Sequence, residues 1–385
     1  MTNNTNFDQE KFDILRLARS NGITINKIHK YLEIYDNCSE IIKNIDKINN
    51  KIVLASEDSI KKEIEETEEI GAQIITYKDE CYPELLNQLD SFPIVLTCRG
   101  NINLLSNEKK IAVIGSRSCS INSFNFSKAI IKEVSNYGYI IVSGLARGID
   151  SSAHIGSIEN GTIAVLGSGI DVIYPKENEY LYYEILSNNS LIISEFSLHS
   201  KPKPENFIMR NRIIAGLSRG VLVVEAGISS GTMHTVKQAL KLGREIMVFP
   251  GSPYDERCSG SNKLLQDGAT MVIDTKDIIE CVENFMPDNC FKDNHFYYNC
   301  NLKENNENIE DNEFKKYYKD ELCQINNISI TEQILSKLDY TPISIDELID
   351  NLPLDLNTIN SELIKLQLNN KIIIDNGRIN LKLNM

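Results

Sequence analysis

Seven short apolar runs, most of them ending in glycine, alternate with longer helical stretches between residues 105 and 283. The runs are IAVIG (111–115), YIIVSG (139–144), TIAVLG (162–167), LIISE (191–195), VLVVEAG (221–227), EIMVFPG (245–251) and TMVI (270–273). Continuous apolar runs of this length are typical of strands buried on both faces of a parallel sheet. We therefore expect a Rossmann-like, doubly wound α/β domain over residues 105–283, with ligands at the carboxyl ends of its strands.

The other segments predict smaller units, as expected for 385 residues, a length that one hydrophobic core seldom serves. Residues 1–70 show short helical periodicities and predict a small all-α domain (SAM/HhH-like). Residues 71–104 form a connector with two strand-like runs, and residues 284–326 form an acidic, Asn-rich linker. Residues 327–385 contain three helical stretches and a hairpin turned at Asn376-Gly377, which predicts a winged helix-turn-helix domain.

Charge is distributed unevenly along the chain. The net charge of −14, taken alone, argues against a nucleic-acid partner. Residues 101–275, however, hold 17 basic and 16 acidic side chains, whereas residues 1–100, 276–330 and 331–385 carry net charges of −6, −6 and −3. The acidic excess lies in the flanking segments, so the nearly neutral middle can present a local basic groove.

Cysteine and histidine spacing predicts neither a metal site nor a disulfide framework. The nine cysteines include no C-x-x-C pair and the five histidines no H-x-x-x-H, so we expect buried free thiols. No apolar run approaches the roughly 18 residues of a membrane span. The first residues, MTNNTNFDQEKFD, lack the basic and apolar regions of a signal peptide, so we expect a cytoplasmic protein without membrane contact.

Two strand ends carry residues suited to binding an anion. The first ends in Gly115-Ser116-Arg117, where a close backbone approach, a hydroxyl and a guanidinium precede a helix starting near Asn122. The second ends in Ser143-Gly144, and its glycine-rich continuation toward Asp150 suggests an anion nest. Neither segment matches G-x-x-x-x-G-K-[ST] or G-x-G-x-x-G, so no nucleotide cofactor is expected. The simpler alternatives are a surface charge for Arg117, a helix cap for Asp150 and a core position for His154.

A third segment, around Phe207, alternates cations with an aromatic ring. Lys201 and Lys203 precede Phe207, and Arg210-Asn211-Arg212 follow it near the start of a helix. Single-stranded nucleic acid favours this pattern, because phosphates pair with the cations while a base stacks on the ring. The alternative is an amphipathic helix that buries Phe207 in the core.

Taken in order, these motifs closely resemble those of the DNA-processing protein A (DprA/Smf) family. The similar segments are GSR (115–117), SGLARGID (143–150), TIAVLGSGID (162–171), YP-x-x-N (174–178), SE (194–195), F-x-x-RNRIIAGLS (207–218), VVEA…SGT (223–232) and PG (250–251). The connector motif YPELL…P…L…G (82–100) and residues 331–385 are also similar. The resemblance covers nearly the whole chain except the acidic linker.

The resemblance implies a non-enzymatic protein that binds and protects single-stranded DNA without sequence preference and loads RecA recombinase on it, in DNA uptake and recombination. It also implies a homodimer, with single-strand-binding protein as a further partner. The implied DNA-binding residues are Gly115, Ser116, Arg117, Ser143, Gly144, Lys176, Lys203, Phe207, Arg210, Asn211 and Arg212. In this pattern Arg117 and Lys176 contact phosphates, Phe207 stacks a base at the groove mouth, and Arg210 and Arg212 line the same groove.

The sequence departs from the family pattern at three places. Pro204 stands where the family often has a basic residue three positions before the phenylalanine, so Lys203 or Lys201 must substitute. Residues 21–24 (NGIT) stand in place of a clear G-x-G hairpin, which weakens any duplex-binding role for the N-terminal unit. The C-terminal domain is acidic, which favours a protein contact over a phosphate backbone.

An enzyme is the main alternative. The Gly231-Thr232 loop also resembles that of phosphoribohydrolases that cleave nucleoside monophosphates, but no carboxylate follows it closely here, so the general acid–base group is missing. A transcriptional regulator that uses the winged helix is a third alternative, and the acidic charge of that domain disfavours it.

Overall fold

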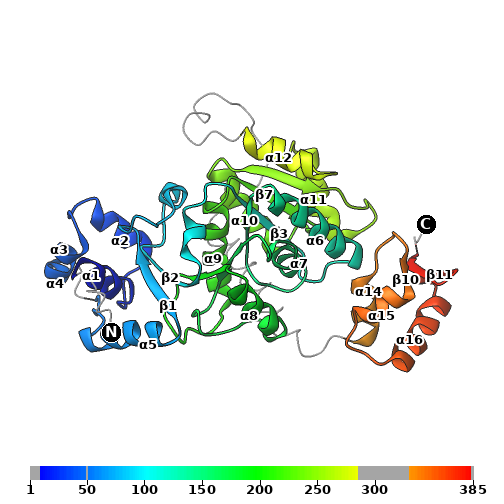
Figure 1. The fold of residues 1–385 in the computed structure, drawn as a ribbon, viewed down its shortest axis with the longest axis horizontal. Coiled ribbons are helices and arrows are strands. Elements are labelled where there is room, and N and C mark those ends of the chain that lie inside the picture. Colours follow the sequence, from blue (N-terminus) through cyan, green and yellow to red (C-terminus); the bar gives the residue numbers. More distant parts are fainter. Residues whose placement is uncertain (1–8, 49–50, 285–328, 383–385) are drawn as a thin grey trace.

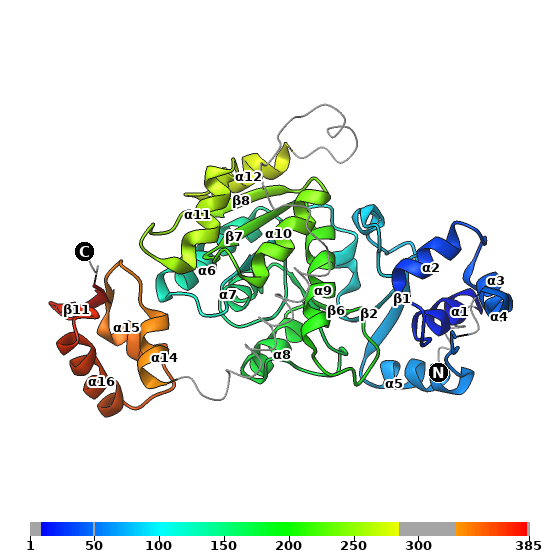
Figure 2. The same ribbon diagram turned by 180° about the vertical axis from the view of Figure 1, so that it is seen from behind.

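The computed structural model describes residues 9–48, 51–284 and 329–382. A central α/β domain lies between a group of N-terminal helices at one end of the molecule and a small C-terminal unit at the other (Figures 1 and 2). The acidic linker expected over residues 284–326 lies outside the described residues, apart from Asn284.

One sheet of nine strands organises the central domain. Its strands are β1 (Ala72–Thr76), β2 (Val95–Gly100), β3 (Lys110–Gly115), β4 (Ile140–Ser143), β5 (Thr162–Leu166), β6 (Leu191–Ser194), β7 (Gly220–Val224), β8 (Glu245–Phe249) and β9 (Thr270–Met271). They are ordered β1-β2-β6-β5-β4-β3-β7-β8-β9, and every pair from β6 to β9 is parallel. Each of the seven apolar runs supplies one of these parallel strands, which confirms the predicted, mostly parallel α/β sheet.

Helices cover both faces of the sheet. One face carries α6 (Ile121–Asn136), α7 (Ile149–Ser157), α8 (Glu179–Ser187) and α12 (Thr275–Glu283), and the other carries α9 (Pro204–Gly216), α10 (Gly231–Lys241) and α11 (Ser259–Gln266). Successive side chains of a strand point to opposite faces. Accordingly, Ile111 and Val113 of β3 lie in the core under α6, whereas Ala112 and Ile114 lie in the core under α9.

The segment expected as a connector forms part of this sheet. Strands β1 and β2 pair antiparallel with each other, and β2 pairs antiparallel with β6 through Thr97 and Ser194. The buried hydroxyl of Tyr82 donates to the carbonyl of Pro93, 2.8 Å away, and ties the intervening loop to β2. The strand-like runs were visible in the sequence, but their partner strand was not, because antiparallel pairing with β6 joins residues nearly 100 positions apart.

The N-terminal helices pack on this added edge of the sheet. They are α1 (Gln9–Ala18), α2 (Ile25–Leu32), α3 (Cys38–Lys43), α4 (Ile45–Ile48) and α5 (Glu57–Glu69). Asn37 and Ser56 cap α3 and α5 by accepting a backbone N–H with their side chains. One apolar cluster joins these helices to Ile74, Ile94 and Val95, so the helical unit and the sheet edge share a core.

The C-terminal unit contains three helices and a small sheet. Its elements are α14 (Ile330–Lys337), β10 (Ile343–Ser344), α15 (Ile345–Asp350), α16 (Leu356–Leu368), β11 (Ile372–Asp375) and β12 (Arg378–Leu381), with the sheet ordered β10-β12-β11. The predicted hairpin turn is present: Asn376 and Gly377 both have positive φ, 48° and 75°, as a two-residue type I′ turn requires. The unit packs its core around Ile121, the first residue of α6, and so contacts the central domain.

The described part of the chain shows three further features. None of its helices combines the length and the apolar character that crossing a membrane requires. No group of three or more His, Cys, Asp or Glu side chains among these residues could hold a metal ion. The six described cysteines are free thiols, and burial raises the pKa of Cys38 and Cys119 to about 12, so neither is a reactive thiolate at neutral pH.

Candidate nucleic-acid interface

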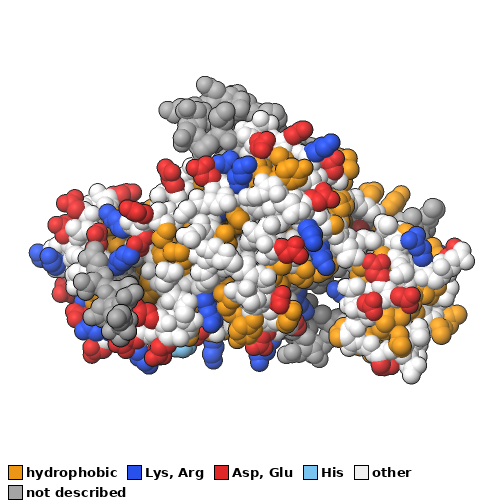
Figure 3. All heavy atoms as spheres, viewed as in Figure 1, with side chains coloured by type: hydrophobic (Ala, Val, Ile, Leu, Met, Phe, Trp, Pro, Cys, Tyr) orange, Lys and Arg blue, Asp and Glu red, His pale blue; other side chains and the backbone are white. Residues whose placement is uncertain are grey.

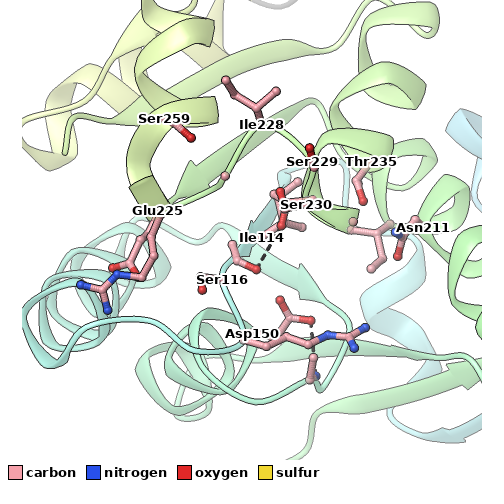
Figure 4. A pocket seen from close by; sticks show the side chains of 18 of the residues that line it. Ile114, Ser116, Asp150, Asn211, Glu225, Ile228, Ser229, Ser230, Thr235 and Ser259 are labelled. Carbon is pink, nitrogen blue, oxygen red and sulfur yellow. Dashed lines mark hydrogen bonds and ion pairs between the residues drawn. The ribbon is translucent and has the colours of Figure 1, made fainter. Parts of the chain in front are cut away.

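A cavity opens where the winding of the sheet reverses. The chain proceeds from β3 to β4, β5 and β6 on one side, and then returns to place β7 and β8 on the other side of β3. Ligands of doubly wound sheets bind at the carboxyl ends of the strands at this point. A cavity of about 480 Å³ lies there; we call it the switch-point cavity (Figure 4). Glu225 lies at one end of it and Asn211 at the other.

The end of β3 forms one wall of the switch-point cavity, as the sequence predicted. Gly115, Ser116 and Arg117 all line it. A side chain at Gly115 would collide with the carbonyl of Val224 on the neighbouring strand, so only glycine permits this close pairing. The Arg117 guanidinium lies 5.5 Å from the centre of the Phe207 ring and also lines a smaller adjacent hollow. Arg117 and Arg210 are therefore the two cations that line both hollows.

The N-terminus of α10 forms the opposite wall. Ser229, Ser230, Gly231 and Thr232 line the cavity, and the Thr232 hydroxyl donates to the carbonyl of Gly115 over 3.1 Å. The N-cap residue Ser230 makes no side-chain cap hydrogen bond, and its buried hydroxyl has no partner within the described residues. The first turn of a helix carries unpaired N–H groups and a partial positive charge, so this wall favours an anion.

The N-terminus of α6 does not offer the open anion site that the sequence suggested. The helix starts at Ile121, and the backbone N–H of its N-cap Ser120 donates to both carboxylate oxygens of Glu225, each over 3.1 Å. Arg257 lies 3.6 Å from the same carboxylate. Burial raises the pKa of Glu225, while Arg257 and the hydrogen bonds from Ser120 oppose that rise. The protein's own carboxylate thus stands where a phosphate was expected.

The glycine-rich loop after β4 is likewise closed from within. The Asp150 carboxylate accepts the backbone N–H groups of Gly144 and Ala146, over 3.1 and 3.3 Å. Burial raises the pKa of Asp150, and the nearby charge of Arg210 opposes that rise. The prediction that this loop forms an anion nest is therefore wrong, because the Asp150 carboxylate already accepts the amides that would bind the anion. Asp150 does not act as the N-cap of α7, which is Gly148; its carboxylate instead holds the loop that precedes the helix.

His154 is a core residue, as expected. It is fully buried, its Nδ1 lies 2.8 Å from the Thr162 hydroxyl, and its Nε2 accepts the backbone N–H of Leu145. Burial, assisted by the positive charge of Arg210, lowers the pKa of His154 to about 3. The ring is neutral at physiological pH and stabilises the same loop that Asp150 holds.

Phe207 lies under arginine and tyrosine side chains. Its ring is only 6% exposed and borders the smaller hollow, 5.5 Å from the Tyr174 ring and 5.9 Å from the Arg210 guanidinium, measured between centres. An exposed ring at the mouth of a groove, as the family pattern suggested, is therefore wrong for this structure. The alternative, in which α9 buries Phe207 in the apolar core, is not observed either. Ile213 and Leu217 of α9 belong to the apolar cluster beneath the helix, and Phe207 does not.

Arg210 and Asn211 line the switch-point cavity from within the protein. Arg210 is 3% exposed, and its Nη1 donates to the carbonyls of Gly144 and Val165 at the ends of β4 and β5. Its Nε donates to the side-chain oxygen of Asn211. A side chain at Gly144 would collide with the guanidinium, which explains the glycine there. The expectation that Arg210 is an open phosphate contact is therefore wrong. Its guanidinium is buried because it supplies the donors that the carbonyls at the strand ends need.

Arg212 points to a different part of the molecule. Its guanidinium pairs with Glu195 over 2.5 Å and lines a cleft between α9, α10 and the N-terminal helices. The prediction that Arg210 and Arg212 line one groove is wrong, because residues two positions apart on a helix point about 200° apart.

The remaining predicted residues lie outside both hollows. Ser143 is buried, and its hydroxyl donates to the carbonyl of Val113 over 2.7 Å. Lys176 and Lys203 are exposed, and neither lines the switch-point cavity or the Phe207 hollow. Lys203 is the N-cap residue of α9 and stands close in sequence to Phe207.

Two residues that sequence reasoning gave no role, Glu225 and Arg257, prove central to the site, and Asp150 has a different role from the expected helix cap. Glu225 and Asp150 receive the loop amides, and Arg257 lines the switch-point cavity beside Glu225. A signal for Glu225 was available: an acidic residue directly after the buried run VLVV, here with a positive φ of 53°. Arg257 gave no such signal, because its position depends on the long loop after β8.

The arrangement suits binding of an anionic ligand at the shared wall of the two hollows. Arg117 and the α10 N-terminus supply positive potential, and the Phe207 and Tyr174 rings lie behind Arg117. The two buried carboxylates of the site, Asp150 and Glu225, are satisfied by backbone amides and by Arg257, and the exposed Glu256 also lines the cavity. On the face shown in Figure 3, Asp and Glu side chains recur over both ends of the molecule, interspersed with Lys and Arg.

Comparison with known proteins places these features in a family. Residues 73–283 match the family model described as DNA recombination-mediator protein A. The DNA processing protein DprA of Streptococcus pneumoniae is 41% identical over 203 residues, which cover 52% of this chain and 71% of that protein. The protein Smf of Escherichia coli is 36% identical over 235 residues, which cover 60% of this chain and 62% of that protein.

Two solved structures show the same likeness in three dimensions. The X-ray structure of DNA processing protein A from Streptococcus pneumoniae matches 72% of this chain and 98% of its own, with a TM-score of 0.60 and 31% identity. A structure of DNA processing protein A from Helicobacter pylori, reported for its single-stranded DNA binding mode, matches 56% of this chain and 98% of its own. Its TM-score is 0.51 and its sequence is 28% identical.

Proposed function

Because the chain belongs to the DNA recombination-mediator protein A family, we propose that it binds single-stranded DNA without sequence preference. In this proposal the bound strand is protected and passed to RecA recombinase during DNA uptake and recombination. The DNA-binding mode reported for the Helicobacter pylori relative supports the choice of ligand.

One observation carries the proposal: Arg117 lies on the wall between the switch-point cavity and the Phe207 hollow. Its guanidinium can donate N–H groups to a phosphate while the α10 N-terminus faces the same cavity. Stacking of the guanidinium over the Phe207 ring, 5.5 Å away, holds the arginine in place. Gly115, Ser116, Gly144 and Asn211 line the two hollows, and the exposed Lys176 and Lys203 add positive charge outside them.

Arg117→Ala tests the proposal directly. A labelled oligothymidylate is titrated with wild type, Arg117→Ala and the control Lys276→Ala, which removes one exposed cation from α12 on the other side of the sheet. We expect Arg117→Ala to weaken binding at least tenfold, since a charge-assisted phosphate contact contributes about 1.5–3 kcal/mol. The control should bind as wild type does. Equal affinities for all three proteins, or equal wild-type affinity for duplex and single strand, would contradict the proposal.

The hydrolase alternative finds less support in the site. Asp150 and Glu225 are the buried carboxylates of the cavity, and each is engaged as an acceptor by two or more backbone or side-chain donors. A general acid or base must instead reach the reacting group of the substrate. Incubation with nucleoside monophosphates and chromatography for free base tests this alternative, and release of base at a rate lost in Glu225→Gln would establish it.

The remaining features of the proposal concern the whole protein. We propose that the C-terminal unit is a winged helix that contacts a protein partner, because exposed apolar residues of α16 such as Ile364 and Leu368 lie in an acidic domain. The N-terminal helices form the small all-α domain. The protein functions as a cytoplasmic homodimer, with RecA and single-strand-binding protein as partners.

A further inference from the structure

A second cationic cleft lies on the other side of helix α9. We call it the α9–α10 cleft; it has a volume of about 910 Å³ and is lined by the ends of α1 and α2, by the segment after β6, and by α9 and α10. Figure 2 shows the green α9 on the side of the central domain that faces the blue N-terminal helices. Nothing in the site described above uses this cleft.

The cleft concentrates positive charge. Arg19, Arg212, Lys237 and Lys241 line it against a single lining carboxylate, Glu195. His234, Lys237 and Lys241 follow one another at intervals of three and four residues, so they share one face of α10. Arg19 and Arg212 are ion-paired with Glu63 and Glu195, so Lys237 and Lys241 supply the net positive charge of the cleft. The protein as a whole carries a charge of −14, so this positive wall is a local exception.

The two arginines are held in place by glutamates, and each has one guanidinium nitrogen whose N–H groups have no acceptor within the described residues. Arg212 pairs with Glu195 over 2.5 Å, and Arg19 pairs with Glu63 over 2.8 Å while donating to the carbonyl of Glu195 over 3.1 Å. Arg19 Nη2 and Arg212 Nη1 are buried and have no acceptor within the described ranges of the chain. Buried donors without acceptors are costly. The protein itself supplies no acceptor for them, and a phosphate oxygen is one.

Helix α9 connects the cleft with the Arg117 site. Phe207 and Arg210 face the hollows on one side of the helix, and Ile208 and Arg212 face the cleft on the other. The exposed Lys201 and Lys203 lie on the segment that joins Ser200, a cleft residue, to the start of α9. Cationic side chains are therefore present at the Arg117 site, on the segment before α9, and in the cleft, where Lys237 and Lys241 lie.

From this continuity we propose that the α9–α10 cleft is a second phosphate site, which takes the backbone of a DNA strand after it leaves the Arg117 site. The inference rests on the proposed function. If the cleft binds DNA, the protein covers more nucleotides of a single strand than the Arg117 site alone would cover. The N-terminal helices then take part in binding, because Arg19 lines the cleft.

Two oligothymidylates test the cleft, one just long enough for the Arg117 site and one several times longer. The variant is Lys237→Ala with Lys241→Ala, which leaves the Arg19 and Arg212 ion pairs intact. The matched control is Lys128→Ala with Lys276→Ala, which removes the same charge from exposed positions of α6 and α12, on the opposite face of the sheet. Thermal melts confirm that both double variants are folded.

The cleft variant should bind the short strand as wild type does and the long strand roughly tenfold more weakly at about 0.15 M salt. Its slope of log affinity against log salt for the long strand should be smaller by about 1.4, because each single-strand phosphate contact contributes about 0.7. The control variant should match wild type with both strands.

Three results would overturn the inference. Unchanged long-strand binding by the cleft variant, with wild type binding both strands, rejects the cleft and leaves the proposed function standing. Failure of wild type to bind either strand rejects both. Saturable binding of inorganic pyrophosphate that is lost in the cleft variant, together with unchanged long-strand binding, assigns the cleft to a small phosphorylated ligand instead.

Discussion

At the scale of single residues, Phe207 shows how the structure changes an expectation. A free stacking ring and a core ring were the two alternatives, and the observed ring is buried beneath Arg117 and beside Tyr174. In the proposed function this buried ring assists DNA binding by holding the Arg117 guanidinium in place.

Substitution of Phe207 by leucine separates these contributions from packing. Phe207→Leu keeps an apolar side chain and should lower the free energy of unfolding by less than about 1.5 kcal/mol. It removes the face on which the Arg117 guanidinium lies, so single-strand affinity should fall by about 0.5–2 kcal/mol. Phe207→Ala, as the comparison, should lose about 3 kcal/mol of stability as well. Urea unfolding and strand titration measure the two effects. Wild-type affinity in Phe207→Leu would mean that the aromatic face is not used.

His154 makes stability depend on pH. The folded state keeps this ring neutral, with a pKa of about 3, whereas the unfolded chain takes up a proton below about pH 6.5. Acidification therefore favours the unfolded chain. Between pH 7 and pH 5 this group should remove about 2 kcal/mol of stability, and His154→Gln should lack that loss.

His199 provides a control of opposite sign. Asp171, 2.6 Å away, raises the pKa of this exposed histidine, so its stabilising effect is present below about pH 6.5 and is lost as the pH rises. Comparison of His154→Gln and His199→Gln with wild type, by urea unfolding at both pH values, cancels the contributions of Asp150 and Glu225. An identical pH dependence in wild type and His154→Gln would show that the ring is not buried in the neutral form.

Side-chain types at the site were predictable from the sequence, but their orientations were not. Gly115, Ser116 and Arg117 lie where a strand end should place them, because a strand end has only one place in a parallel sheet. Arg210 and Arg212 could not be assigned in this way. Which side of α9 faces the strand ends depends on how the helix packs against β4 and β5. As a result, Arg210 contacts the strand ends, whereas Arg212, two positions later, faces the α9–α10 cleft.

At the scale of elements, the strands of the central sheet were the most predictable part. An apolar run that must be buried on both faces has few alternatives. The antiparallel edge β1-β2 and the docking of the C-terminal unit were not predictable, because each depends on contacts between segments far apart in the chain. Arg257 is one of several residues at this contact: it donates to the carbonyls of Ser336 and Leu338, each over 2.6 Å, at the end of α14.

Loss of Arg257 should release the end of α14. An arginine at a helix C-terminus satisfies otherwise unpaired carbonyls and interacts favourably with the helix dipole. Arg257→Ala should therefore speed amide hydrogen exchange in α14 and around Tyr340. The control Arg219→Ala removes a surface ion pair with Glu108 and should leave that exchange unchanged. Unaltered α14 exchange in Arg257→Ala would show that the apolar contact with Ile121 is sufficient for docking.

At the scale of the whole molecule, the central domain carries the proposed binding sites and the C-terminal unit lies against one end of it. The switch-point cavity is formed entirely by residues 114–259, and the α9–α10 cleft adds the N-terminal helices. The C-terminal unit touches the central domain through Ile121, Asn122 and Arg257, close to the cavity but without lining it. Charge distinguishes the two regions, since residues 331–385 are acidic and the central residues are not.

A chain that ends at Asn284 should therefore fold and bind single-stranded DNA at least as tightly as the full chain. Removal of the C-terminal unit uncovers Ile121, which is 1% exposed in the full protein, so the truncated chain is paired with a version carrying Ile121→Ser to limit association. Circular dichroism and thermal melts check the fold, and strand titrations over a range of salt check binding. The salt slope should stay unchanged, because no phosphate contact is expected from an acidic unit. Loss of binding with an intact melt would instead place part of the DNA site on the C-terminal unit, and the cavity at the end of β3 would then be only one half of it.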